Sequence, residues 1–391
     1  MYRILTTHNI DRRGLEVLER EGFEYSVDMT DYQAMLLKGR DIKDMPLGEE
    51  LLAIARAGAH PTNVPVSECN EAGIVVFYMP GANANAVKEL TLASLILSGR
   101  DLIGAAAWTD ETKDLSDAAT ERVKSEYSGK EIAGLTLGVI GLGSIGSMVA
   151  DSAISLGMNV IGYDPYIDVA SAWRLPNGVG RATDMQEMIS KCDIVTVHLP
   201  DNDETRGMIN ASFLAAMKDG ARLINHSTGN IADAAAVREA LESGRLASYV
   251  TDFPSPLLRG VRGAIQFPHI GSETPETEEK CSEIAAESLA DYLKTGNIRN
   301  SINFPDCYMP WRGMTRIAIV NFNIPSMISM MTTIVAREGI NIEHMINRSK
   351  GNIAYTLIDV DAPAYKCSRL VDDLRQVGGI VRVRMVREEG K

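Results

Sequence analysis

A glycine-rich turn between an apolar strand and a helix constrains the fold of this chain more than any other feature. Residues 135–157 read LTLGVIGLGSIGSMVADSAISLG, in which Gly141, Gly143 and Gly146 form a GxGxxG pattern. The first glycine permits a tight turn, the second lets a pyrophosphate approach the backbone, and the third lets the helix pack on the strand. The free N–H groups at the start of that helix complete an anion site. The pattern therefore predicts a dinucleotide-binding unit.

The next apolar run, NVIGYD, ends at Asp164, 18 residues after Gly146. A carboxylate at this distance binds the 2′-hydroxyl of the adenosine ribose and repels a 2′-phosphate. No arginine follows in the sequence DPYID. NAD is therefore favoured over NADP as the cofactor, while a packing turn that binds no cofactor stays open as the alternative.

Short apolar runs alternate with helical runs along most of the chain, which indicates α/β architecture with parallel sheets. The run of units around the glycine turn predicts a doubly wound, Rossmann sheet over residues 99–271. A smaller α/β lobe is expected from residues 1–98 with 272–304, and one long helix over 85–108. Residues 303–313 are rich in turn formers and indicate a linker. Residues 314–391 have the β-α-β-β-α-β order of a ferredoxin-like domain.

The composition of the chain limits the kinds of partner that we expect it to bind. The formal net charge is −13, and no run of lysine and arginine stands out, so we expect neither a nucleic-acid nor a membrane partner. The first residues contain no long apolar stretch, so a secretion signal is not expected. The five cysteines are scattered, with no CxxC pair, which favours reduced thiols and a cytoplasmic protein.

Several motifs in order give the chain a family resemblance. These are GLGSIG with YDP, CDIVTVHLP, GMINASFLAAMKDGARLIN and FPHIGSET, preceded by ARAGAHPTNVPV and PGANANAVKEL. In this combination the chain resembles the D-2-hydroxyacid dehydrogenases, and within them the 3-phosphoglycerate dehydrogenase type, which carries a C-terminal ACT regulatory domain. The resemblance implies two lobes, NAD as cofactor, a small anionic 2-hydroxy acid as substrate, a role in serine biosynthesis, and a homodimer or homotetramer.

The resemblance also assigns catalytic positions. His269, in FPHIG, falls on the position of the acid/base histidine. The family arginine that holds the substrate carboxylate lies in a pattern like N-x-[SA]-R-G, and here Thr228 occupies its place in Asn225-His226-Ser227-Thr228-Gly229. The glutamate that tunes the histidine should lie near Pro256, where no carboxylate stands, and Glu273 is one acid that could substitute.

The remaining assigned positions form three groups. Cofactor contacts, besides the three turn glycines and Asp164, are expected at Ser144, Ile145, His198, Pro200, His226, Ser227, Asp252 and Gly271. Substrate contacts are expected at Lys38, His60, Asn83 and Ala84. An amino-acid effector is expected to contact Asn323 and Asn341, although Asn321 replaces the histidine of the family pattern. No spacing of histidines or carboxylates indicates a metal site.

Two functions fit this pattern, in which the cofactor motif is intact and the substrate positions are altered. The first is NAD-dependent oxidation of a 2-hydroxy acid, in which Lys38, Arg262 or another cation replaces the missing arginine. The second is a catalytically impaired paralogue that binds NAD and acts as a sensor or as a partner subunit. Reductases of unrelated substrates are a third, more remote class.

Overall fold

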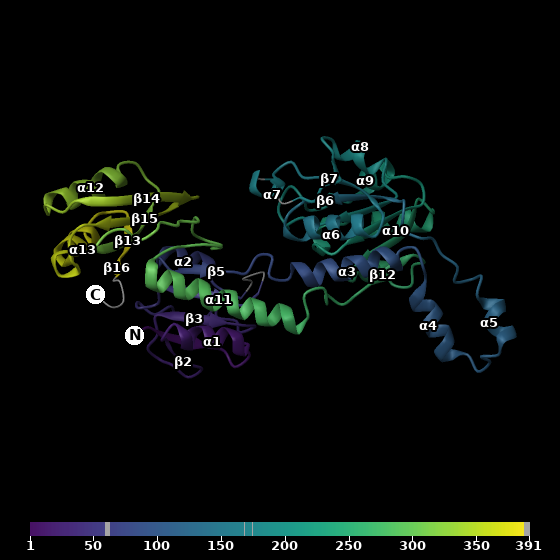
Figure 1. Cartoon of the computed structure of the whole chain (residues 1–391), viewed down its shortest axis with the longest axis horizontal. Coiled ribbons are helices and arrows are strands. Elements are labelled where there is room, and N and C mark those ends of the chain that lie inside the picture. The colour runs from purple at the N-terminus through teal and green to yellow at the C-terminus, as the bar shows by residue number, and fades with distance from the viewer. Residues whose placement is uncertain (59–62, 168, 174, 387–391) are drawn as a thin grey trace. The chain divides into compact units, whose positions relative to one another are not determined.

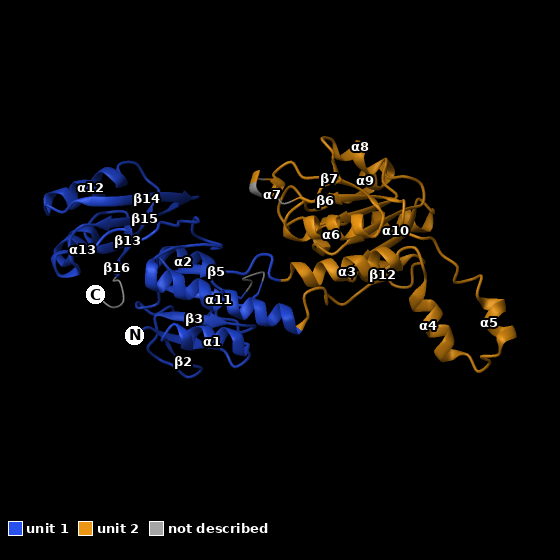
Figure 2. Cartoon of the chain, viewed as in Figure 1, with its two compact units in different colours: residues 1–82, 275–391 blue, residues 83–274 orange. Residues whose placement is uncertain are grey.

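The computed structural model describes residues 1–58, 63–167, 169–173 and 175–386, and it forms two compact units. The first comprises Met1–Ala82 and Pro275–Lys391, and the second Asn83–Thr274 (Figure 2). The sequence placed the corresponding boundaries at 98/99 and 271/272. The difference arises because the helix from Ala84 to Leu97 packs with the helix after the glycine turn, in the second unit.

A parallel sheet with the strand order β2-β1-β3-β4-β5 forms the first part of unit one. Its strands are β1 (Arg3–Thr6), β2 (Glu24–Ser26), β3 (Ala34–Leu37), β4 (Ala53–Arg56) and β5 (Val75–Phe77). Its helices are α1 (Arg12–Arg20), α2 (Val66–Glu71) and the returning α11 (Pro275–Thr295). Helix α11 packs on α1 because Cys281, Ala285, Leu289 and Leu293, spaced four apart, form one buried stripe.

The second unit is built on a seven-stranded parallel sheet with the order β12-β11-β10-β9-β6-β7-β8. Three of its strands, β6, β7 and β12, are labelled in Figure 1. Counted from β6, this is the 3-2-1-4-5-6 order of a Rossmann fold with one added strand. The strands are β6 (Thr136–Ile140), β7 (Asn159–Tyr163), β8 (Val179–Arg181), β9 (Ile194–Val197), β10 (Ala221–Asn225), β11 (Leu246–Thr251) and β12 (Ala264–Gln266). The doubly wound sheet predicted from the sequence is confirmed.

Helices and short 3-10 turns connect these strands. They are α3 (Ala84–Leu97), α4 (Leu102–Glu111), α5 (Asp117–Val123), α6 (Ser144–Ser155), α7 (Val169–Trp173), α8 (Met185–Ile189), α9 (Ala211–Ala216), η1 (Gly229–Ile231), α10 (Ala234–Glu242) and η2 (Pro256–Leu258). The single long helix expected over 85–108 is wrong, because α3 ends at Leu97 and α4 starts at Leu102 after a bend of 74°. Asp101 caps α4 by accepting a hydrogen bond from Gly104 N.

The C-terminal segment forms an antiparallel sheet with the order β14-β15-β13-β16. Its elements are β13 (Thr315–Phe322), α12 (Met327–Arg337), β14 (Ile342–Lys350), β15 (Ile353–Val360), η3 (Ala364–Lys366), α13 (Ser368–Arg375) and β16 (Ile380–Val386). This is the predicted β-α-β-β-α-β order and is compatible with an ACT domain. Both helices are amphipathic and bury their apolar sides in one cluster with the sheet.

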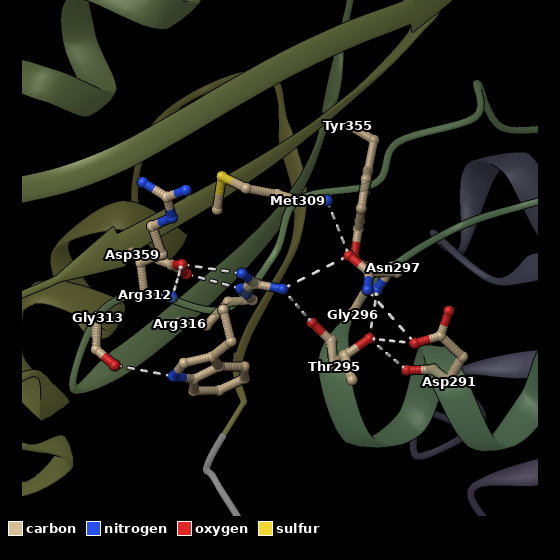
Figure 3. Close-up of polar contacts among 11 residues, drawn as sticks. Asp291, Thr295, Gly296, Asn297, Met309, Arg312, Gly313, Arg316, Tyr355 and Asp359 are labelled. Atoms are coloured by element: carbon tan, nitrogen blue, oxygen red, sulfur yellow. Dashed lines mark hydrogen bonds and ion pairs between the residues drawn. The ribbon is translucent and has the colours of Figure 1, made fainter.

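The C-terminal sheet is joined to α11 by buried polar contacts rather than by a free hinge (Figure 3). Arg316 and Asp359 are both fully buried and form a bidentate pair, with Nε–Oδ1 2.6 Å and Nη2–Oδ2 2.8 Å. Arg316 Nη1 also donates to the Thr295 carbonyl at the end of α11 (3.0 Å). Tyr355 Oη donates to the carbonyl of Gly296 (2.6 Å), so the sheet holds the C-terminal end of this helix.

The segment 303–313 connects these parts, as expected of a linker, but it is packed into the core. Phe304 and Cys307 are fully buried, and Phe304 meets the ring of Tyr355 edge to face with the centroids 6.2 Å apart. Met309 N donates to Asn297 Oδ1 (3.1 Å). Besides its turn-forming residues, this stretch has apolar side chains, and their burial fixes the position of the linker.

All five cysteines are buried and free: Cys69, Cys192, Cys281, Cys307 and Cys367. Among the described residues, no single helix has the length and apolar character needed to cross a membrane. Only the bent pair α3 and α4 meets those criteria together.

Candidate active site

The glycine turn has the geometry that a dinucleotide requires. Gly141 has φ +86°, and a Cβ there would lie 2.3 Å from the His198 carbonyl oxygen. At Gly146 a Cβ would lie 1.9 Å from the Gly141 carbonyl oxygen, so this glycine lets the helix pack against the turn. At Gly143, by contrast, a Cβ would meet no atom within 4 Å. The middle glycine therefore borders open space, which is where a pyrophosphate would approach.

The start of α6 supplies donors toward that space. Gly143 is the N-cap and offers no side-chain cap, so the first-turn N–H groups, including those of Ser144 and Ile145, have no intrahelical partner. These N–H groups and the positive end of the helix dipole suit a phosphate anion. The turn and the helix start together fit the diphosphate of NAD.

Asp164, directly after β7, is fixed beside this turn. Its Oδ2 accepts a hydrogen bond from Leu142 N (2.9 Å), and its Oδ1 accepts one from Tyr166 N (2.9 Å). The carboxylate thus has a defined position at the carboxyl end of the second strand of the fold. A negative charge at that position fits a ribose diol and opposes a 2′-phosphate.

Ser227, one of the predicted cofactor positions, joins the ends of β9 and β10. Ser227 Oγ donates to the Val197 carbonyl (2.6 Å) and accepts from Leu199 N (3.0 Å). The neighbouring Pro200 carbonyl accepts from Thr205 Oγ1 (2.6 Å). The loops after these strands are therefore held at one sheet edge, close to the glycine turn through His198 N, which donates to Ile140 O (2.8 Å).

His226 is buried under α3 as a neutral imidazole. Ser94 Oγ donates its single proton to the Leu90 carbonyl (2.8 Å) and lies 2.8 Å from His226 Nε2. The other ring nitrogen, Nδ1, is buried and has no partner among the described residues. Burial lowers the pKa of His226 to about 4, and the charge of Asp252 opposes that shift only in part.

His198 lies close to His226 and has the same character. Its Nε2 is 3.0 Å from Thr196 Oγ1, and its Nδ1 is buried with no partner in the described part of the chain. Burial of the ring, with a smaller contribution from His226, lowers the pKa of His198 to about 3. Neither ring carries a charge at neutral pH.

His269 lies in the loop after β12, on the surface of the second unit. Its φ is +58°, and its ring contacts the Phe253 ring with centroids 4.7 Å apart. The next two residues donate their N–H groups to the buried carboxylate of Asp252: Ile270 N to Oδ1 (2.8 Å) and Gly271 N to Oδ2 (2.7 Å). Three predicted site residues, His269, Asp252 and Gly271, therefore belong to one structural group.

Thr228 has a local role in the loop after β10. It is the N-cap of η1, and its Oγ1 accepts from Asn230 N at 3.4 Å. Its carbonyl accepts from Asn225 Nδ2 (2.9 Å). The position at which the family resemblance expects a guanidinium holds a neutral hydroxyl that caps its own turn.

The first unit, described by itself, has the cations Lys38 and Arg56 at the carboxyl edge of its sheet. Lys38, after β3, forms an ion pair with Glu278 (Nζ–Oε1 2.7 Å). Arg56, at the end of β4, donates through Nε to Asn63 Oδ1 (3.0 Å), and its two terminal nitrogens have no partner among the residues described. Burial lowers the pKa of Arg56, yet a guanidinium keeps its charge. The sequence pattern indicated Lys38 and did not indicate Arg56. Arg56 lies in the ARAG motif, two residues before its glycine.

The other predicted substrate positions are less informative. Asn83 precedes α3 at its N-cap position without a side-chain cap hydrogen bond, and Ala84 is buried. Both belong to the second unit, whereas Lys38 belongs to the first. His60 lies outside the described residues.

The two expected effector contacts, Asn323 and Asn341, do not line the same pocket. Asn323 lines a pocket of about 150 Å³ at the start of α12, together with Asn321, Ser326 and Asn347. Asn341 does not line it; its side chain donates to Glu343 Oε1 (3.1 Å). Across the residues the structure describes, no group of three or more histidine, cysteine or acidic side chains could hold a metal ion.

Comparison with known proteins identifies the nucleotide-binding part. Residues 94–271 match the family model described as "D-isomer specific 2-hydroxyacid dehydrogenase, NAD binding domain". This part of the chain is thus similar to the NAD-binding domain of the D-2-hydroxyacid dehydrogenases.

Its relatives include several D-3-phosphoglycerate dehydrogenases. The chain is 29% identical to that of Haemophilus influenzae over 357 residues, covering 86% of this chain and 82% of the relative. It is 31% identical to that of Methanocaldococcus jannaschii over 326 residues, covering 78% of this chain and 60% of the relative.

Solved structures share the fold. The TT0316 protein from Thermus thermophilus aligns with a TM-score of 0.62 at 27% identity, covering 77% of this chain and 99% of that one. An NAD+-bound 3-phosphoglycerate dehydrogenase of Entamoeba histolytica aligns with a TM-score of 0.60 at 23% identity, covering 77% and 98%. At that identity the second likeness concerns the fold alone.

Proposed function

We propose that the chain is an NAD-dependent dehydrogenase of a 2-hydroxy acid, related in substrate to 3-phosphoglycerate and so to serine biosynthesis. One observation carries the proposal: the second unit combines an open glycine cradle at Gly143 and an exposed histidine, His269, on a fixed loop. The names of the relatives support the same class of substrate.

We assign to the chain's own residues the binding of NAD and the acceptance of one proton from the substrate. NAD, when bound, supplies the acceptor for the hydride from the substrate carbon. The α6 N-terminus and the glycine turn hold its diphosphate, and Asp164 its ribose. His269 accepts the proton of the substrate hydroxyl as a general base, the role that an exposed imidazole beside the cofactor can fill.

A cation is needed for the substrate carboxylate, and Arg56 is the best candidate among the described residues. Its terminal N–H groups have no partner among the described residues, whereas Lys38 is already paired with Glu278. A guanidinium binds a carboxylate through two parallel hydrogen bonds, which a lysine cannot do. We therefore propose that Arg56 binds the carboxylate of an anionic ligand.

The test is to incubate the full chain with NAD and a panel of D-2-hydroxy acids that includes 3-phosphoglycerate, and to follow NADH formation. We expect turnover with at least one phosphorylated or short-chain acid. His269→Gln should lower kcat by roughly 10²- to 10⁴-fold if this residue is the base. No NADH from any acid would exclude the dehydrogenase.

Thr228 favours a second candidate, an NAD-binding paralogue with little turnover. Loss of an electrostatic substrate contact typically costs about 10²–10³ in rate. This candidate predicts NAD binding by calorimetry with no NADH from any acid. Under it, His269→Ala leaves the cellular function of the chain unchanged.

We also propose that an amino acid binds in the C-terminal pocket and regulates the protein. Asn321 lines this pocket, and its Oδ1 is buried with no partner in the described residues. Ser326 starts α12 without a side-chain cap, so N–H groups of that helix are free for a carboxylate. Calorimetry with serine and other small amino acids tests the assignment, and no heat from any of them would exclude it.

A further inference from the structure

The family resemblance expects a glutamate near Pro256 to orient the acid/base histidine, and this chain has none. Pro256 instead begins the short turn η2. Among the described residues, no carboxylate is hydrogen-bonded or ion-paired to His269, and Glu273 only donates its own N–H to the Ile270 carbonyl (3.0 Å). The orientation of His269 must have another source.

Asp252 holds the backbone on the C-terminal side of this histidine. It follows β11, is 3% exposed, and accepts from Ile270 N and Gly271 N with different oxygens. Hydrogen bonds to a carboxylate are about twice as strong as neutral ones. No lysine or arginine in the described chain forms an ion pair with Asp252, so these two N–H groups are its main partners.

The loop around His269 is shaped for this contact. A φ of +58° is uncommon for a residue other than glycine and persists only where neighbouring contacts impose it. Phe267 N donates to Thr251 O (2.9 Å) before the histidine, and the Asp252 carboxylate fixes the chain after it. A Cβ on Gly271 would lie 2.8 Å from Asp252 Oδ2, so a side chain there would displace the carboxylate or the loop.

The imidazole itself rests on an aromatic ring. Phe253, adjacent to Asp252 in sequence, lies against His269 with an interplanar angle of 49°. Phe253 N donates to Thr251 Oγ1 (3.2 Å), which fixes the start of that turn. Two neighbouring residues therefore set the backbone and the ring of His269 from one side.

We propose that Asp252 is a positioning residue for His269, in that its carboxylate clamps Ile270 N and Gly271 N and thereby directs the imidazole against Phe253. The inference rests on the proposed function for the role of His269, but the clamp is a property of the free protein. It goes beyond cofactor contact, because a residue that only bound NAD would not control the loop in its absence.

The test compares Asp252→Asn with Asp233→Asn. Asp233 also accepts from two backbone N–H groups, those of Ala235 and Ala236, at the start of α10. In Asp252→Asn an amide NH₂ opposes one of the two N–H donors, because these donors bind different oxygens. In Asp233→Asn the amide oxygen can accept both N–H groups, because both bind Oδ1. Only the first affects the loop of His269, so Asp233→Asn is the matched control.

The first readout needs neither substrate nor NAD. In Asp252→Asn we expect hydrogen exchange at Ile270 N and Gly271 N to accelerate by roughly 10- to 100-fold, and the His269 ring resonances to shift. Asp233→Asn should leave both unchanged. If Asp252→Asn does not fold, Gly271→Ala and Phe253→Leu are used, and each should shift the His269 resonances. Unchanged exchange and unchanged His269 resonances overturn the clamp, whatever the activity assay gives.

The second readout uses the active enzyme. A positioning role predicts a lower kcat and an altered pH profile of kcat in Asp252→Asn. A raised KM for NAD with an unchanged kcat overturns the positioning role. Because the exchange data are collected on the free protein, failure of the clamp and failure of the dehydrogenase proposal are distinguishable.

Discussion

At the scale of single residues, the proposed role of Arg56 in binding a carboxylate can be tested. We expect Arg56→Lys to lower kcat/KM for the hydroxy acid by roughly 10-fold or more, because lysine keeps the charge and loses the bidentate geometry. Arg12→Lys is the control, since Arg12 is an exposed arginine of α1 that pairs with Glu16. Steady-state kinetics checks the prediction, and equal kcat/KM in the two variants would contradict it.

His226 makes the second unit sensitive to acid. Its pKa is about 4 in the folded protein, below the ordinary value of 6.5, so the unfolded state binds more protons between these values. The free energy of unfolding should therefore fall as the pH drops from about 6.5 toward 4, by up to roughly 3 kcal/mol from this group.

Urea unfolding measured from pH 7 to pH 4.5 checks this sign. In His226→Gln the glutamine does not titrate, so the decline with acid should become shallower than in the unchanged protein. His344→Gln is the control, because His344 lies on an exposed part of β14. An identical pH dependence in wild type and His226→Gln would show that this ring is not the acid-sensitive group.

Sequence reasoning found residues with a standard spacing and missed those defined by contacts. The three turn glycines and Asp164 follow a fixed pattern, and each lies where the pattern predicts. That Lys38 is engaged by Glu278 while Arg56 keeps free donors depends on α11, which comes much later in the chain. The resemblance pointed to Asp252 and Gly271 separately, but nothing in the sequence indicated that one binds the other.

At the scale of elements, the two glycines at the start of α6 are expected to have different roles. Gly143 borders open space where the cofactor would bind, and Gly146 lets the helix pack against the turn. We expect Gly143→Ala to fold normally and to weaken NAD binding, because the added methyl enters the space beside the helix start. Gly146→Ala should instead destabilise the unit, since its methyl would meet the Gly141 carbonyl. Calorimetric NAD titration and thermal unfolding of both variants check the contrast, which equal NAD affinity in Gly143→Ala and wild type would refute.

The break between α3 and α4 shows why one element was predicted wrongly. The apolar residues of 85–108 continue at helical spacing through Ser98-Gly99-Arg100-Asp101, so periodicity alone predicts one helix. The break follows from contacts: a Cβ on Gly99 would lie 2.4 Å from the guanidinium of the buried Arg222, and Asp101 caps a new helix. The glycine and the aspartate were visible in the sequence, but the arginine beneath them was not.

At the scale of the whole molecule, the C-terminal sheet and the first lobe share one hydrophobic core. Phe77 and Tyr292 from the lobe and Tyr355 and Val386 from the sheet belong to the same buried cluster. Arg384 extends this contact, since its guanidinium lies over the Tyr292 ring (4.4 Å) and donates to the Leu293 carbonyl (2.9 Å). The ferredoxin-like order was predictable from strand and helix periodicity. Its attachment to α11 was not, because it depends on pairs of side chains far apart in the sequence.

The buried Arg316–Asp359 pair should therefore control the stability of the whole first unit (Figure 3). Asp359→Asn leaves the Arg316 charge buried without a compensating charge, so we expect a loss of about 3–5 kcal/mol in the free energy of unfolding. Asp361→Asn is the control, because Asp361 accepts an exposed hydrogen bond from Asn341 N.

Replacing both partners, as Arg316→Met with Asp359→Leu, removes the buried charge and should recover most of the loss. Urea unfolding followed by the fluorescence of Trp311, whose ring lies under the Arg316 guanidinium (4.7 Å), reports on this junction directly. A loss in Asp359→Asn no larger than in Asp361→Asn would mean that the sheet is held to α11 by its apolar contacts alone.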